Sequence, residues 1–407
     1  KHLKAPREAD GPSRSSSDVD ESLRNVDEAF ELPKDGDENE TAIAQFDSLA
    51  ACPPLAGHRD TVRCVSFDRE ANLMFTASWD KTVLVWDLGK LEHVAVLPHE
   101  AWVNYVLSIR SSVTGLQIFT AAEDGHLTLW KEFRATTGRD FSVAGQWKLS
   151  QGPLTSMCVH EESTIFSASL DQVVAFSVAS GSLLRTYRLE SDVSVVVAVE
   201  ELLYCGCDDG RIACVDIIGG FALRQLVGHK GGVKQLIAAA AYNTLYSSGD
   251  DGCVRLWLLS TGQCTKVWKI HDRPICALAL HVGERDRFLF SASTNGVVRC
   301  TRIASGASCV VRHCAVSAMA TVDLAEPDGR NSLTRKEPRS AAEVAAANLR
   351  LGGGSPAQGR SDDTTVPAAA SGKLICGDMR GQVYVFPTNA SENHVLSSDI
   401  QRHRVRM

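Results

Sequence analysis

A short stretch of this chain, FTASWDKTVLVWDL at residues 75–88, returns along the sequence at a nearly constant interval. Similar stretches end at Trp130 and Trp257, and in all three an aspartate lies six residues before the tryptophan. A period near 40 residues is typical of proteins in which each repeat is one small unit that buries its faces against its neighbours. This repeat constrains the fold more than any other feature of the chain.

Each copy opens with an apolar strand start, which in several copies follows a histidine by four residues, as in GHRDTVRCV and GHKGGVKQL. Successive starts are 41, 51, 39, 40, 42 and 41 residues apart. The starts are Val62, Val103, Leu154, Val193, Val233, Ile275 and Val316. Short apolar or alternating segments separated by Gly, Asp or Asn turns predict four antiparallel strands in each copy. The sequence therefore predicts an all-β protein, a seven-bladed β-propeller of four-stranded antiparallel blades.

Composition predicts three domains or segments. Residues 1–48 carry 13 acidic and 6 basic side chains, so we expect a disordered acidic N-terminal arm. Residues 49–389 form the propeller, and LAACPPLAGH at its start is expected to supply the outer strand of the last blade. Residues from about 325 to 371, rich in Ala, Gly, Ser and Pro, predict a disordered loop insertion between the first two strands of that blade. Residues 390–407 form a C-terminal tail.

The arm contains an apolar stripe at helical spacing, and a shorter insertion lies near residues 131–145 in the second copy. The stripe consists of Val19, Leu23, Val26 and Phe30. Such a segment could fold into a partner's groove, remain unbound, or cover part of the propeller. Both insertions are expected to leave the same face of the ring, opposite the face that carries the aspartate turns.

Gly-His and Trp-Asp at these spacings make residues 50–388 resemble the WD-repeat family. The resemblance implies a structural tetrad in the first blade, His58, Ser78, Asp80 and Trp86, in which the hydroxyl links the histidine to the indole. It also implies that the turn position of Asp80 is occupied in other copies by Asp124, Asp171, Asp209, Asp251 and Asn295. A Ser-His-Asp nucleophilic triad is the competing interpretation, but a catalytic group repeated around a ring does not describe one active site.

In this family, the turn that carries the aspartate lies on the top face, where ligands usually bind. The residues expected on that face are Arg59, Trp79, Trp102, Glu123, His126, Lys230, Asp250 and Arg273. Trp79 and Trp102 could either pack against a neighbouring blade or contact a partner, and large aromatic side chains and arginines dominate interface energetics. Charges of both signs favour a protein or peptide partner over a phosphate group.

Several classes of function are disfavoured by composition. The formal net charge of −7 argues against nucleic acid as a partner. The 13 cysteines lack the spacing of a zinc site or a disulfide framework, which favours a reducing intracellular compartment, the cytoplasm or the nucleus. A phosphate-binding glycine loop and an apolar run long enough to insert into a membrane are both lacking. We therefore expect no metal and no cofactor.

Together these patterns predict a non-catalytic scaffold or adaptor, a subunit of a larger complex rather than an enzyme. It would bind partners on the top face and through insertions on the opposite face. The alternative interpretation is a substrate-recognition module of a ubiquitin ligase or another multisubunit enzyme, in which a partner supplies the catalysis.

Overall fold

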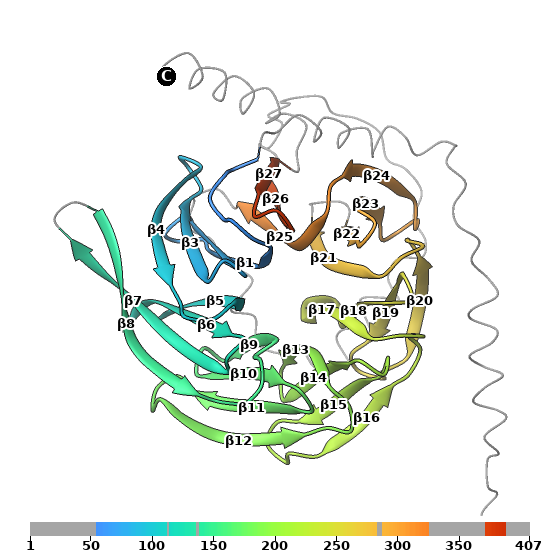
Figure 1. Ribbon diagram of the computed structural model, residues 1–407. Helices are drawn as coiled ribbons and strands as arrows, with labels where there is room; N and C mark the ends of the chain where they lie inside the picture. Colours follow the sequence, from blue (N-terminus) through green and yellow to red (C-terminus); the bar gives the residue numbers. More distant parts are fainter. Residues whose placement is uncertain (1–53, 112–113, 136–137, 283–286, 325–370, 388–407) are drawn as a thin grey trace, which may run out of the picture.

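The computed structural model describes residues 54–111, 114–135, 138–282, 287–324 and 371–387. Within these ranges the chain forms seven antiparallel sheets arranged in a ring (Figure 1). Six sheets have four strands and one has three, and in each the strands follow one another in chain order. The seven-bladed β-propeller predicted by the repeat is therefore confirmed. No helix in the described residues is long and apolar enough to cross a bilayer.

The first four blades contain strands β1 to β16. Blade 1 contains β1 (Val62–Asp68), β2 (Leu73–Ser78), β3 (Thr82–Asp87) and β4 (Glu92–Pro98). Blade 2 contains β5 (Val103–Ser111), β6 (Gly115–Ala122), β7 (His126–Ala135) and β8 (Gly138–Lys148). Blade 3 contains β9 (Ser156–His160), β10 (Thr164–Ser169), β11 (Gln172–Ser177) and β12 (Ser182–Arg188). Blade 4 contains β13 (Val193–Val199), β14 (Leu202–Cys207), β15 (Ile212–Asp216) and β16 (Ala222–Leu226).

The last three blades complete the ring. Blade 5 contains β17 (Val233–Ala239), the 3₁₀ helix η2 (Ala240–Tyr242), β18 (Thr244–Gly249), β19 (Cys253–Leu258) and β20 (Cys264–Lys269). Blade 6 contains β21 (Ile275–Val282), β22 (Arg287–Ser293), β23 (Val297–Arg302) and β24 (Ser308–His313). Blade 7 contains β25 (Val316–Leu324), β26 (Ser371–Asp378) and β27 (Val383–Pro387). Six of the seven predicted strand starts are confirmed, and β9 begins two residues after Leu154.

The ring is closed by the beginning of the described chain. Leu55 forms an isolated antiparallel bridge with Val383 of β27, with N–O distances of 2.7 Å and 3.2 Å in the two hydrogen bonds. The segment before blade 1 therefore pairs with the outer side of blade 7, as LAACPPLAGH predicted. Residues 325–370 lie between β25 and β26, where the insertion was expected. The predicted arm, the insertion and the C-terminal tail lie outside the described residues.

Apolar side chains from neighbouring blades form the core. Seven clusters bridge successive sheets, and the second strand of each blade supplies the deepest residues, as in the fully buried β2. In a strand, successive side chains point to opposite faces, and here both faces are covered by another blade. This explains why the inner strands read as nearly continuous apolar runs.

The loops fall on two opposite faces. The turn between the second and third strands approaches the loop before the first strand, as in the hydrogen bond from Glu123 N to Trp102 O (2.8 Å). The turn between the first and second strands approaches the turn before the fourth, as in the bond from Ile217 N to Glu201 O (3.0 Å). We call these the upper and lower faces.

The shorter insertion follows β7, the third strand of blade 2, on the lower face as expected. Near residues 131–145 the chain does not leave the sheet in a loop, because β7 and β8 remain paired in register as far as Ala135 and Gly138. The result is a two-stranded arm that extends past the rest of blade 2 (Figure 1). The residues added to this copy lengthen a hairpin.

Candidate protein-binding site

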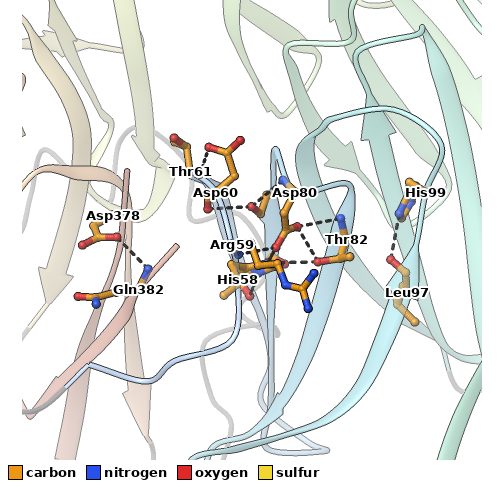
Figure 2. A network of polar contacts seen from close by, with 12 residues as sticks. His58, Arg59, Asp60, Thr61, Asp80, Thr82, Leu97, His99, Asp378 and Gln382 are labelled. Atoms are coloured by element: carbon orange, nitrogen blue, oxygen red, sulfur yellow. Dashed lines mark hydrogen bonds and ion pairs between the residues drawn. The ribbon is translucent and has the colours of Figure 1, made fainter. Parts of the chain in front are cut away.

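A polar network in blade 1 joins the loop before β1 to the interior of the sheet (Figure 2). His58 Nδ1 lies 2.8 Å from Asp80 Oδ2, and its Nε2 lies 2.8 Å from Thr76 Oγ1. The Trp86 indole N–H donates to the same hydroxyl at 2.8 Å. His58, Thr76, Asp80 and Trp86 therefore form the tetrad, and every buried polar group in it has a partner.

The assignment of Ser78 to this tetrad was wrong. Ser78 lies two residues beyond Thr76 on β2, and this distance of roughly 6.6 Å along the strand takes its hydroxyl away from the indole. Its Oγ instead donates to Asp60 O at 3.0 Å and accepts from Asp80 N at 3.1 Å. Ser78 thus holds the upper turn, and the hydroxyl that links histidine to tryptophan stands four residues before the aspartate.

The same spacing identifies the tetrad in blade 5. Its members are His229, Ser247, Asp251 and Trp257. Blade 2 keeps a histidine–hydroxyl–indole chain, in which His99 and Trp130 both meet Thr120. There Asp124 Oδ2 lies 3.0 Å from His126 Nδ1, in the same turn.

Burial and hydrogen bonding set the protonation of these groups. Burial alone would raise the pKa of Asp80, but hydrogen bonds from His58 and Thr82 outweigh it and lower the pKa below its ordinary value. The pKa of Asp251 is lowered in the same way, because the hydrogen bond from His229 outweighs the effect of burial. Burial lowers the pKa of His99, and that of His271 in blade 6, to about 4. The His58 and His229 side chains are fully buried and their partners Asp80 and Asp251 are at most 10% exposed, so these groups are paired with one another inside the blades.

The remaining repeat-turn residues lie where the repeat placed them, between the second and third strands of their blades. Asp209 accepts hydrogen bonds from Arg211 Nε at 2.7 Å and from the Arg211 amide at 2.9 Å. Asn295 Oδ1 accepts from Val297 N at 3.1 Å. Asp171 lies between β10 and β11, directly before the start of β11. In blade 7, Asp378 takes over this function by accepting from the amides of residues 380 and 382 (Figure 2).

Three of the predicted upper-face residues come together where blades 1 and 2 meet. Trp79 and Trp102 stack with ring centroids 5.3 Å apart and an interplanar angle of 26°. The Trp79 indole N–H donates to Asn104 Oδ1 at 3.1 Å, and Asn104 Nδ2 donates to Glu123 Oε2 at 2.7 Å. Trp79 is half-buried in this arrangement, whereas Trp102 remains 46% exposed. Trp79 therefore packs on its neighbouring blade, and Trp102 presents its ring to the upper face.

An arginine completes this stack. The Arg63 guanidinium carbon lies 5.1 Å from the centroid of the Trp79 ring, within the range of a cation–π interaction. The five residues Arg63, Trp79, Trp102, Asn104 and Glu123 form what we call the aromatic site.

A second group of upper-face residues lies on blades 4 and 5. Lys234 Nζ is 3.0 Å from Asp208 Oδ1 and 3.5 Å from Asp250 Oδ2, and Ser194 donates to the same Asp208 oxygen. Although partial burial opposes ionisation, the hydrogen bonds from Ser194 and Lys234 lower the pKa of Asp208. Two carboxylates thus share one ammonium group at this place, which we call the charged site.

The other predicted upper-face residues do not join either site. Arg59 and Lys230 follow the tetrad histidines, and their backbone amides donate to Asp80 and Asp251. The Arg273 carbonyl accepts from Ser293 Oγ at 3.3 Å. The side chains of these three residues are exposed. His126 is occupied by its contact with Asp124.

Sequence analysis missed Arg63, Asn104, Ser194 and Lys234, and one signal could have found two of them. All four directly follow a strand start, at the innermost strand of their blade. At this position in other blades the side chain donates to the next blade, as Thr155 does to Val193 O (3.1 Å) and Cys276 does to Val316 O (3.0 Å). Arg63, Ser194 and Lys234 instead contact side chains on the upper face. A charged residue after a strand start could therefore have identified Arg63 and Lys234, whereas nothing in the sequence separates Asn104 and Ser194 from Thr155.

Known proteins resemble this chain in the repeats. The family model described as "WD domain, G-beta repeat" matches residues 52–87 and 220–257, which include all residues of the two complete tetrads. Human angio-associated migratory cell protein is 25% identical over 287 residues, which covers 55% of this chain and 64% of that protein. The chain therefore spans less than two thirds of that relative.

Two further relatives are of the same kind. Serine-threonine kinase receptor-associated protein of Gallus gallus is 26% identical over 251 residues, covering 58% of this chain and 68% of that protein. The periodic tryptophan protein 2 homolog of Schizosaccharomyces pombe is 30% identical over 166 residues, or 37% of this chain and 19% of that protein. With the ring of seven sheets and the tetrads, these matches identify the chain as a WD-repeat β-propeller.

Proposed function

We propose that this protein is a non-catalytic scaffold that binds other proteins or peptides on its upper face. The observation that carries the proposal is the aromatic site, where Trp102 is 46% exposed although its ring is supported from below by Trp79. A rigid, preorganised aromatic ring that loses little conformational freedom on binding is a frequent centre of protein interfaces. Arg63 beside it adds a cation that can meet a carboxylate of the partner.

The charged site supports the same function. Asp208, Asp250 and Lys234 present both signs of charge on another part of the upper face, which suits a protein or peptide with a defined charge pattern better than a phosphate backbone. A scaffold of this kind would be a subunit of a larger complex. Its many cysteines suit a reducing compartment, so we propose that it acts inside the cell, in the cytoplasm or nucleus. One relative is named for its association with a receptor kinase, which fits a role in bringing proteins together.

The test is affinity purification with mass spectrometry on the full chain and two variants. Trp102→Ala removes the exposed ring of the aromatic site. Tyr242→Ala removes an equally exposed ring from the turn between β17 and β18 (47% exposed) and serves as the matched control. We expect Trp102→Ala to lose the main partners by at least tenfold in recovered signal, and Tyr242→Ala to keep them.

Two results would decide against this assignment. If Trp102→Ala retains all partners, the aromatic site is not the binding surface. If the lost partners are subunits of a ubiquitin ligase, the chain is a recognition module for that enzyme rather than a general scaffold.

A further inference from the structure

The lower edge of blades 3 and 4 exposes large apolar side chains on the outer strand β12 of blade 3, on the outer strand β16 of blade 4 and in the turn before β16. Ile218 is 72% exposed, Phe221 58% and Leu184 56%. Such exposure is ordinary for single residues, but a group of them on adjacent strands marks a surface that something covers. We call this group the rim patch, and its members are Leu183, Leu184, Ile218, Phe221 and Leu223.

Close contacts hold the two halves of the rim patch together. Arg185 of β12 donates from Nη1 to Ile218 O in the turn before β16, at 2.6 Å. In that turn, Gly220 has a positive φ of 79°, and a Cβ atom there would clash with the Arg185 guanidinium. A Cβ atom on Gly219 would clash with the Phe221 ring, which folds back over the turn. The patch is therefore one surface that spans two blades.

Positive charge borders this surface. Arg185 donates to the carbonyl of residue 218, and Arg224 donates to the carbonyls of residues 259 and 260. These carbonyl partners carry no net charge, and among the described residues neither arginine has a carboxylate within ion-pair distance, although Asp216 lies in the same turn and accepts from the Gly219 amide. The lower turns of the same blades carry the exposed pairs Glu161–Glu162 and Glu200–Glu201, and Glu201 O accepts from the amide of Ile217 beside the patch, so an acidic partner would meet Arg185 and Arg224 at the outer strands rather than these turns.

We propose that the rim patch is covered by this chain's own N-terminal segment, residues 17–32. The segment SDVDESLRNVDEAFEL carries six acidic side chains and one basic one. Its apolar stripe, Val19, Leu23, Val26 and Phe30, recurs at helical spacing and matches the apolar rim patch, while its carboxylates match Arg185 and Arg224.

The length of the chain allows this contact. The described chain begins beside blade 7, where Leu55 pairs with Val383, and blades 3 and 4 lie across the ring from it (Figure 1). Residues 33–53 connect the segment to the propeller and can span roughly 70 Å when extended. The distance to be covered is the width of two four-stranded blades, about 30 Å at the usual spacing between strands, together with the width of the central opening. A tether of this kind also raises the effective concentration of the segment at the patch.

Hydrogen exchange measured by mass spectrometry on the full chain tests the proposal. The rim variant Leu184→Asp/Phe221→Asp should speed exchange of the amides in residues 17–32 by about tenfold or more, because the bound segment is released. The matched control Val94→Asp/Val96→Asp places the same charges on exposed positions of the outer strand of blade 1 and should leave that exchange unchanged.

A second variant keeps the test decisive if the rim variant fails to fold. Leu23→Asp/Phe30→Asp changes only the arm, and it should speed exchange of residues 217–226, which the segment would otherwise cover. Unchanged exchange in both variants overturns the proposal. Light scattering gives a second outcome that overturns it. If the wild-type chain has twice the monomer mass and the rim variant has the monomer mass, a second copy of the chain is the occupant of the patch.

Discussion

Blades 1 and 5 contain the complete tetrad, whereas blades 3 and 4 lack both its histidine and its tryptophan, yet all four are four-stranded sheets of the same order. In blade 3, a hydrogen bond from Ser169 to Ser150 (2.7 Å) ties the loop before β9 to the end of β10. Phe176 packs against Trp147 of blade 2 with centroids 4.8 Å apart. The comparison shows that burial between neighbouring sheets builds a blade, and that the tetrad fastens one loop to it.

The largest effect should come from removing the tetrad tryptophan. Trp86→Ala leaves a cavity between blades and removes the indole that donates to Thr76, so we expect a loss of about 3–5 kcal/mol in the free energy of unfolding, measured by denaturant titration. Trp102→Ala, at an exposed ring, should cost less than about 1 kcal/mol. Equal costs would show that the tetrad indole adds nothing to the blade beyond what an exposed ring adds.

The corrected hydroxyl position predicts a contrast within one strand. Thr76→Val keeps the shape of the side chain but leaves the buried His58 Nε2 atom and the Trp86 N–H group without their shared hydroxyl partner, at a cost of about 2–3 kcal/mol. Ser78→Ala removes two hydrogen bonds at the edge of the upper turn, at about 1 kcal/mol. Thermal unfolding of the two variants measures the difference, and a larger effect at Ser78 would restore the original assignment.

Blades 2 and 6 should respond to acid before blades 1 and 5. Burial lowers the folded-state pKa of His99 and His271 to about 4, below the ordinary value of 6.5, so the unfolded chain binds more protons between these values. Stability is therefore full above pH 6.5 and declines as the pH falls toward 4, by an amount on the order of 2 kcal/mol for each histidine. The lowered pKa values of Asp80 and Asp251 add a further loss only below about pH 4.

Unfolding measured at intervals between pH 7 and pH 4 checks this window. His99→Gln/His271→Gln should flatten the decline, since glutamine does not titrate. A decline of the same slope in this variant would assign the acid sensitivity to other groups.

The smallest effect is expected in blade 4. Arg211 contacts Asp209 and Glu190 on the surface, and exposed ion pairs add little to stability because water and salt screen them. Arg211→Ala should therefore leave the melting temperature unchanged. A clear loss would mean that this pair replaces the tetrad energetically as well as in position.

The periodic sequence was sufficient to predict the ring, the number of blades and most strand boundaries, because turn residues and apolar alternation act over a few neighbouring residues. It also placed Trp79, Trp102 and Glu123 on one face. Sequence analysis chose Ser78 over Thr76 because both hydroxyls stand on β2 and the copies were not compared at these two positions. The repeat does distinguish them, since the position of Thr76 is a hydroxyl residue in the copies that end at Trp130 and Trp257, whereas the position of Ser78 is alanine or glycine there.

The sequence by itself determined that this chain builds seven sheets and closes them with its own beginning, since each repeat carries its turns and its apolar strands within about 40 residues. Only the tertiary structure decided which side chains meet between blades. Arg63 comes from a strand, Trp79 from a turn and Trp102 from a loop of the next blade, and their stack depends on the rotation of one sheet against the next. The rim patch exists for the same reason, because neighbouring outer strands bring residues from separate repeats side by side.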